Sequence, residues 1–379
     1  MNIINRFSKF LIIVFIVYLA LAPTPIVGSG LMRFFPTLTL LLVLFFGICG
    51  FRAGRFAKMG TIVSVFLIYI IFSAMIHQPF EESKIMTLLK SSYWCWIYLV
   101  AFTLFMHSYI KDKQRDLAIV LTTVLFSFSF NYSHISRLIE FDLIGDNAVF
   151  YPLLMVPWIA CISNITKRWV MLALVALCAI TALKRSGIII ISTSAFLLYY
   201  GDFIHRQRLH FKTILMALFV VAGMFAIVEY KADSISDLSQ RFDLIKDDGG
   251  SGRDGIYEDV YNRYLSSSID KQILGHGFDG VRRDSSYIIP VSAHNDFLEV
   301  LYDFGVIGFL LYVLIHFSLI KWTIYLFRAR SRLAFPVLIS YVCFLVMSIV
   351  SHLVLYPTYF GLLVAFWAYA ECKDKELQY

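Results

Sequence analysis

Charged residues are scarce in this 379-residue chain: Asp, Glu, Lys and Arg make up 16% of it, whereas apolar residues make up 59%. Soluble domains carry roughly 25% charged and 45–50% apolar residues, so the composition excludes an ordinary soluble protein. The short alternation of apolar and polar residues that builds an outer-membrane barrel is also absent, because the apolar residues occur in long blocks. The sequence therefore predicts a protein of many bilayer-spanning helices.

Cysteine is sparse as well, and the six cysteines show no CxxC spacing. All but Cys372 lie in apolar blocks, which predicts neither a disulfide framework nor a zinc site. We expect no metal and no other cofactor. The formal net charge of +7 does not indicate nucleic-acid binding, since Lys and Arg gather in the cytoplasmic loops of membrane proteins for reasons of insertion.

The apolar blocks predict an all-α polytopic membrane protein with about 12 transmembrane helices. The blocks span residues 10–28, 35–51, 60–77, 91–109, 116–131, 147–165, 168–183, 186–203, 213–229, 295–319, 334–355 and 358–371. The first block has the shape of a secretory signal, but the many spans after it favour an uncleaved first helix.

The loop charges predict the orientation of these helices. With the N-terminus inside, the short cytoplasmic loops hold most of the cations outside the long loop, including Arg52, Arg55, Lys58, Lys111, Lys113, Arg115, Lys167, Arg168, Arg206, Arg208, Lys212, Lys321, Arg328, Arg330 and Arg332. The positive-inside rule then predicts that both termini are cytoplasmic. The chain divides into residues 1–229 with helices 1–9, a long periplasmic loop at 230–294, and residues 295–379 with helices 10–12.

Residues 230–294 form the only substantial hydrophilic segment, so functional residues are expected there and at the adjoining helix ends. Within this loop, apolar residues of 253–267 recur every three or four positions, which predicts a helix lying on the membrane or on the bundle. Two GxGxxG matches, at 250–255 and 275–280, lack the βαβ unit that dinucleotide binding requires. They predict turns, whose successive N–H groups can bind an anion.

His294 lies where the tenth span begins, with Asn295 or Asp296 as the predicted N-cap and Glu299 in the first turn. This arrangement places an imidazole beside unpaired backbone N–H groups at the membrane surface. A phosphate could bind at such a place, and a base could act there. The alternative is that His294 only caps the helix end.

Lys184 and Arg185 lie in a short loop on the side where such loops carry few cations. Cations at the membrane edge are costly to place there, so they indicate a functional role. The alternative is a tight hairpin whose cations reach toward lipid headgroups. Arg253 begins the loop helix and supports the same hypothesis more weakly, since a loop Arg is more often a solvated ion pair.

Together these segments resemble the O-antigen ligase and polymerase superfamily. The resemblance covers residues 180–320 and rests on Lys184-Arg185-Ser186-Gly187, Ser251-Gly252-Arg253, Leu274-Gly275-His276-Gly277, and His294-Asn295 followed after nine residues by Gly305-Val306-Ile307-Gly308. It implies a GT-C-like, metal-independent glycosyltransferase of the bacterial inner membrane, with its active site on the periplasmic side.

The resemblance also implies the ligands and the roles of the site residues. The donor would be an oligosaccharide linked to undecaprenyl diphosphate, with membrane lipid and a chain-length regulator as further partners. Arg185, Arg253 and Lys184 would bind the diphosphate, because cationic donors stabilise the charge that develops on it. His294 would act on the acceptor hydroxyl or contact the phosphate itself. Asn295, Gly305 and Gly308 would support the site.

Among the activities of this superfamily we expect an O-antigen or surface polysaccharide polymerase, which transfers the glycan onto a lipid-linked repeat unit. The alternative is an O-antigen ligase, which transfers it to the lipid A core; the sequence shows no added basic patch outside that would dock such a phosphorylated acceptor. A non-enzymatic flippase or transporter would carry charges at several mid-helix positions, whereas here the cations cluster at one face of the membrane.

Overall fold

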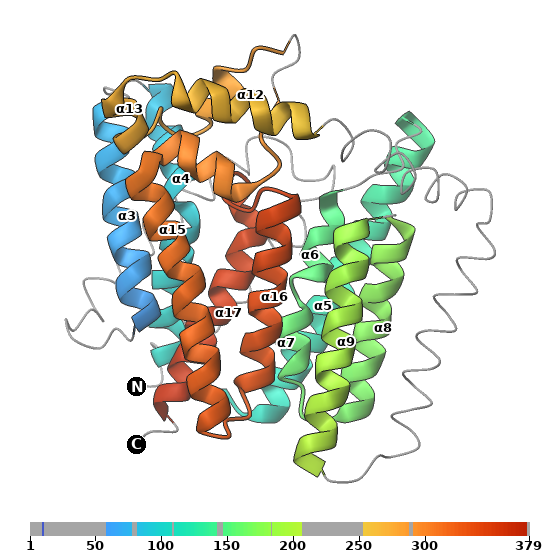
Figure 1. The fold of residues 1–379 in the computed structure, drawn as a ribbon. Helices are drawn as coiled ribbons and strands as arrows, with labels where there is room; N and C mark the ends of the chain where they lie inside the picture. Colours follow the sequence, from blue (N-terminus) through green and yellow to red (C-terminus); the bar gives the residue numbers. More distant parts are fainter. Residues whose placement is uncertain are drawn as a thin grey trace.

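The described part of the chain is built from helices (Figure 1). The computed structural model describes residues 10, 58–77, 82–107, 110–141, 147–182, 184–206, 253–287 and 291–376, and these ranges contain no strand. The helices are α3 (Lys58–His77), α4 (Glu82–His107), α5 (Asp112–Phe141), η1 (Asn147–Val149), α6 (Phe150–Leu153), α7 (Val156–Ala160), α8 (Ile165–Thr181), α9 (Arg185–Arg206), α12 (Arg253–Leu265), α13 (Ile269–Leu274), α14 (Gly280–Arg283), α15 (Asp296–Arg328), α16 (Ala334–Val350) and α17 (Pro357–Glu376).

Each predicted span within the described residues coincides with a helix, except that 147–165 is a series of short helices. Four described helices are long and apolar enough to cross a membrane, at Met59–His77, Asp112–Ile135, Ser186–Ile204 and Asp296–Arg328. The all-α membrane architecture is therefore confirmed. The predicted spans 10–28 (apart from residue 10), 35–51 and 213–229 lie outside the described residues, so the total of about 12 spans and the full extent of the long loop stay predictions.

The spanning helices run alternately up and down, so that their ends gather at two opposite ends of the bundle (Figure 1). One of these ends holds the first residues of α5 and α8, the last residues of α9 and α15, and the C-terminal end of α17. There Arg168 pairs with Asp202 at 2.8 Å and Arg115 with Asp116 at 2.8 Å. Helices α12, α13 and α14 cover the opposite end. This arrangement is the one that the positive-inside rule predicts for the loops.

Helix α15 is not the straight span that the sequence predicted at 295–319. It breaks at Gly305, whose φ of 64° and ψ of −171° are not helical. The rings of Phe297 and His316 lie 5.1 Å apart, although a straight helix would separate these residues by roughly 28 Å at about 1.5 Å per residue. Residues 296–304 therefore fold back along the rest of α15.

Glycine is required at this break for two reasons. The positive φ of Gly305 is costly for any other residue, and a Cβ there would lie 2.3 Å from the backbone oxygen of Ile273. Gly275, with φ of 88°, faces the same contact from the other side, since its Cβ would lie 2.2 Å from the Asp303 carbonyl oxygen. The two backbones thus approach each other as closely as glycine allows.

Helix α12 packs its apolar side on the start of α15. The predicted helix in the loop is confirmed, and Ile256, Val260 and Tyr264 of its apolar face pack on the bundle, whereas Tyr261 and Leu265 are exposed. The buried cluster that joins the two helices consists of Val260, Tyr264, Val281, Ala293 and Tyr302. Burial of this apolar area fixes the first residue of α12 relative to the entrance of α15.

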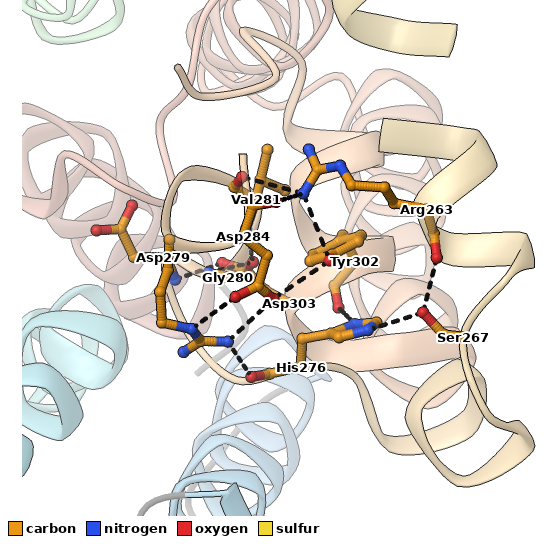
Figure 2. A network of polar contacts seen from close by, with 10 residues as sticks. Arg263, Ser267, His276, Asp279, Gly280, Val281, Asp284, Tyr302 and Asp303 are labelled. Atoms are coloured by element: carbon orange, nitrogen blue, oxygen red, sulfur yellow. Dashed lines mark hydrogen bonds and ion pairs between the residues drawn. The ribbon is translucent and has the colours of Figure 1, made fainter. Parts of the chain in front are cut away.

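The turn at 275–280 binds a carboxylate of the protein itself. Asp303 accepts hydrogen bonds from the backbone N–H groups of Asp279, Gly280 and Val281 at 2.7, 2.9 and 3.2 Å (Figure 2). The predicted anion-binding turn is therefore present, and Asp303 occupies it. Its role is to attach α14 to α15, because a buried carboxylate with this many donors is well compensated.

A second set of polar contacts surrounds Tyr302 (Figure 2). Arg263 donates to the Asp284 carbonyl oxygen at 2.8 Å and lies over the Tyr302 ring. The His276 ring stacks on Tyr302 at 4.0 Å, with Nδ1 3.1 Å from the Tyr302 carbonyl oxygen and Nε2 2.8 Å from Ser267 Oγ. Both nitrogens of His276 are thus used within the fold, and this histidine has a structural role.

Candidate active site

Side chains from four separate segments meet at the end of the bundle that α12 covers. Lys184 precedes α9, Arg253 is the first residue of α12, His294 precedes α15, and His352 lies in the turn between α16 and α17. Lys184 and Arg253 act electrostatically on both imidazoles. The described structure therefore brings together three of the residues predicted from the sequence and one that was not predicted.

His294 is held in place by the start of α15. Its φ of 53° lies in the left-handed region, where a non-glycine residue needs support from its surroundings. That support comes from Asn295, whose Oδ1 accepts from the backbone N–H groups of Phe297 and Leu298 at 2.9 and 3.2 Å. The prediction of an N-cap at Asn295 or Asp296 is confirmed for Asn295.

Asp296 has a different role. Its buried carboxylate accepts from the backbone N–H groups of Leu353 and Val354 at 3.1 and 3.3 Å, and the Tyr312 hydroxyl donates to it at 3.0 Å. These bonds tie the α16–α17 turn, residues 351–356, to the first turn of α15. The residue that follows the N-cap thus fixes the position of the segment that carries His352.

His352 lies against His294 and is almost fully enclosed. The two ring centroids are 4.5 Å apart, and on its other side His352 stacks on Tyr356 at 4.8 Å. The residue is 4% exposed, and its buried Nδ1 has no hydrogen-bond partner among the residues that the structure describes. Buried polar atoms without partners are uncommon in folded proteins and call for an explanation.

Arg253 approaches the same turn from α12. Its Nη1 donates to the Val350 carbonyl oxygen at 3.1 Å, at the C-terminal end of α16. Within the described residues this guanidinium pairs with no carboxylate. The alternative interpretation of Arg253 as a solvated ion pair therefore finds no support in this part of the chain.

Lys184 is anchored to α6 and its preceding turn. Its Nζ donates to Asn147 Oδ1 at 2.8 Å and lies 5.8 Å from the centroid of the Phe150 ring. Arg185 is the first residue of α9, but its side chain lies outside the described part of the structure. The backbone of Arg185 is thus at the site, and the role of its guanidinium stays a prediction.

The surroundings keep both imidazoles uncharged. Burial lowers the pKa of His294, and the positive charges of Arg253 and Lys184 lower it further. Burial lowers the pKa of His352 to about 3, with smaller contributions from His294, Arg253 and Lys184. At neutral pH the site therefore combines two cationic groups with two neutral imidazoles, a combination suited to an anionic group beside a proton acceptor.

The two motif glycines shape the scaffold under this site. Gly305 forms the break in α15, and a Cβ at Gly308 would lie 2.2 Å from the Phe304 Cβ. The Tyr69 hydroxyl of α3 donates to the Phe304 carbonyl oxygen at 2.7 Å, next to the break. His294, Gly305 and Gly308 thus all belong to the folded-back start of α15.

In the part of the chain that the structure describes, no group of three His, Cys, Asp or Glu side chains could hold a metal ion. His276 and His294 do not share one site. His276 is part of the network around Tyr302, and His294 faces His352.

Sequence reasoning missed His352 because the apolar block 334–355 was taken as one span. Helix α16 ends at Val350, and Ser351-His352 begins the turn. The signals available were the polar pair Ser351-His352 and Pro357, which is the first residue of α17, since proline is favoured at the first helical position.

These features define a helical membrane protein with a cationic site that carries imidazoles at one end of its bundle. Residues 170–313 match the family model described as O-antigen ligase, which supports the resemblance to the superfamily that the motifs indicated. Its members are glycosyltransferase-like enzymes of ligase or polymerase type that act on lipid-linked oligosaccharide. No curated protein is similar enough to this chain to match it.

Proposed function

We propose that this protein is an O-antigen or surface polysaccharide polymerase of the bacterial inner membrane. It takes an oligosaccharide from undecaprenyl diphosphate and transfers it onto a lipid-linked repeat unit at the periplasmic face. The observation that carries the proposal is the arrangement around His294. Arg253 donates to the Val350 carbonyl oxygen, two positions before His352, whose ring lies 4.5 Å from the His294 ring, and Lys184 and Arg253 both act electrostatically on His294.

Lys184 and Arg253 bind the diphosphate of the donor. As the sugar–phosphate bond breaks, negative charge develops on the departing diphosphate, and fixed cationic donors stabilise it. Arg253 keeps its charge at any physiological pH, and its anchor on Val350 holds the guanidinium in place. Arg185, the first residue of α9, joins these two cations.

His294 acts on the acceptor. Its neutral imidazole accepts the proton of the acceptor hydroxyl while that oxygen forms a bond to the sugar carbon, and the undecaprenyl diphosphate leaves with the electron pair. The positive charge gained by His294 then faces the diphosphate, which is a favourable pairing. The reaction needs a base and cations, and His294 with Lys184 and Arg253 would supply them.

The family model described as O-antigen ligase favours a second function, the transfer of the glycan to the lipid A core. The chemistry at the donor is the same, so the acceptor distinguishes the two. A chain-length regulator would be a partner of the polymerase.

The lipopolysaccharide ladder of a deletion strain tests the choice. Loss of a polymerase leaves the core with one repeat unit, whereas loss of a ligase leaves the bare core. We expect core plus one unit, with the ladder restored by the wild-type gene and not by an Arg253→Ala gene expressed to the same level. Bare core in the deletion strain would show that the protein is a ligase and not a polymerase.

A further inference from the structure

The α16–α17 turn lies outside the segment that matches the O-antigen ligase family, which ends at residue 313, yet it forms one side of the candidate site. Asp296 holds this turn by two backbone N–H groups, and Arg253 donates to the carbonyl oxygen just before it. Arg253 belongs to the predicted machinery, and Asp296 lies two positions after His294. The turn is thus fixed to the site by the same elements that position His294.

The side chain that this turn presents to the site is His352. Its ring lies between two other rings, with His294 at 4.5 Å and Tyr356 at 4.8 Å. An enclosed aromatic ring restricts the rotation of a ring packed against it, because the packed interior leaves few rotamers open. The only described ring contact of His294 is with His352.

We propose that His352 is a positioning residue, which fixes the His294 ring against rotation and shields it from water so that one ring nitrogen faces the acceptor hydroxyl. This inference rests on the proposed function for its consequence in catalysis. The geometric part, the orientation and shielding of His294 by His352, concerns the free protein alone.

The charged and titratable groups around the His294 ring come from several elements. Arg253 of α12 and Lys184 before α9 lower the pKa of His294, and burial lowers it most. Asp296 on α15 is engaged by the turn, and Tyr356 lies beyond His352. Since His352 is itself uncharged at neutral pH, its removal should act on His294 through burial and not through charge.

Two substitutions distinguish the role of the aromatic ring of His352 from the role of its ring nitrogens. His352→Ala removes the ring, so we expect the pKa of His294 to rise toward its ordinary value near 6.5 and kcat to fall roughly ten- to a hundred-fold. His352→Phe keeps a flat ring of similar size, and should leave both quantities near the wild-type values. Donor KM should change little in either variant.

The titration of His294 is measured without any substrate. Diethyl pyrocarbonate reacts with the unprotonated imidazole, and mass spectrometry of the purified full-length protein follows modification of His294 across pH. Transfer from purified lipid-linked donor in liposomes gives kcat and KM. His276→Ala is the matched control, because His276 also stacks on an aromatic ring at this end of the bundle and should not move the titration of His294.

Each possible result tests one part of the proposal. Unchanged titration and unchanged kcat in His352→Ala would remove His352 from the site. If His352→Phe were as inactive as His352→Ala while His294 titrated normally, the nitrogens of His352 would contact substrate, and the positioning role would be wrong. If the wild-type protein transferred no glycan, the proposed function would be wrong, and the titration would still decide whether His352 shields His294.

Discussion

At the scale of single residues, the site depends on keeping a histidine uncharged beside cations. Burial and the charges of Arg253 and Lys184 all lower the pKa of His294, so it is a proton acceptor in the resting protein. A bound diphosphate would offset the two positive charges and raise that pKa. The base would therefore become stronger when the donor is present.

The role of His294 can be tested by two substitutions. His294→Ala should lower kcat by roughly a hundred- to ten-thousand-fold while donor KM stays nearly constant, because a general base acts on the transition state. His294→Gln should be as inactive, since an amide can donate to phosphate but cannot accept a proton at neutral pH. Both are measured with purified lipid-linked donor. Substantial activity in the Gln variant would assign His294 to phosphate binding instead.

The pH dependence of kcat/KM reports the free enzyme. A base works only when it is unprotonated, so activity is lost as the pH falls through the pKa of His294. Because this pKa is lowered, the acid limb of the wild-type profile should lie below the ordinary histidine value of about 6.5. Lys184→Met removes a positive charge and should move the limb to higher pH. A limb that stays in place would show that Lys184 does not act on the base.

At the scale of elements, the entrance of α15 organises the site. Its fold-back at Gly305 brings Phe297 against Phe309, Tyr312 and His316 of the same helix. Asp303 then docks α14 through the turn at 275–280. Asn295 and Asp296 have different roles at its first turn. Asn295 caps the helix, and Asp296 holds the α16–α17 turn. The backbone of His294 is thus placed by the first turn of α15.

Gly305→Ala tests this element. The added Cβ would lie 2.3 Å from the Ile273 carbonyl oxygen and would sit at a positive φ, so we expect a loss of at least about 1–3 kcal/mol, seen as a lower midpoint of thermal unfolding in detergent. Gly255→Ala is the control. Its Cβ would meet only Tyr287 Oη at 3.6 Å within helix α12, where alanine should stabilise by about 0.5–1 kcal/mol. Equal midpoints for the two variants would contradict the close approach.

At the scale of the whole molecule, the described helices separate two kinds of surface. The helix ends that adjoin the short cation-bearing loops lie at one end of the bundle, and α12–α14 lie at the other (Figure 1). The positive-inside rule predicts that the end with the short cation-bearing loops faces the cytoplasm.

Cysteine labelling tests that orientation. Ser268 is exposed at the end that α12 covers, and Lys113 is exposed at the opposite end. In cells with a permeabilised outer membrane, Ser268→Cys should react with a membrane-impermeant thiol reagent, and Lys113→Cys should react only after lysis. The described native cysteines are buried or partly buried, so their background should be low. The reverse pattern would invert the topology.

The sequence by itself determined the membrane character, most of the described long helices, the helix that begins at Arg253 and the N-cap at Asn295. These are local properties, because hydropathy, charge and capping depend on neighbouring residues. The sequence also indicated Lys184, Arg253 and His294, through cations and an imidazole at helix ends. It left the side chain of Arg185 a prediction that the described residues do not test.

Only the tertiary structure decided which of these residues meet. The break of α15 needs both Gly305 and Gly275, thirty positions apart in the sequence, to remove their side chains from one backbone contact. His352 joins the site because Asp296 binds the turn that carries it, and a buried carboxylate finds its donors through packing of whole helices. Such contacts depend on the close approach of distant segments, which no local pattern in the chain specifies.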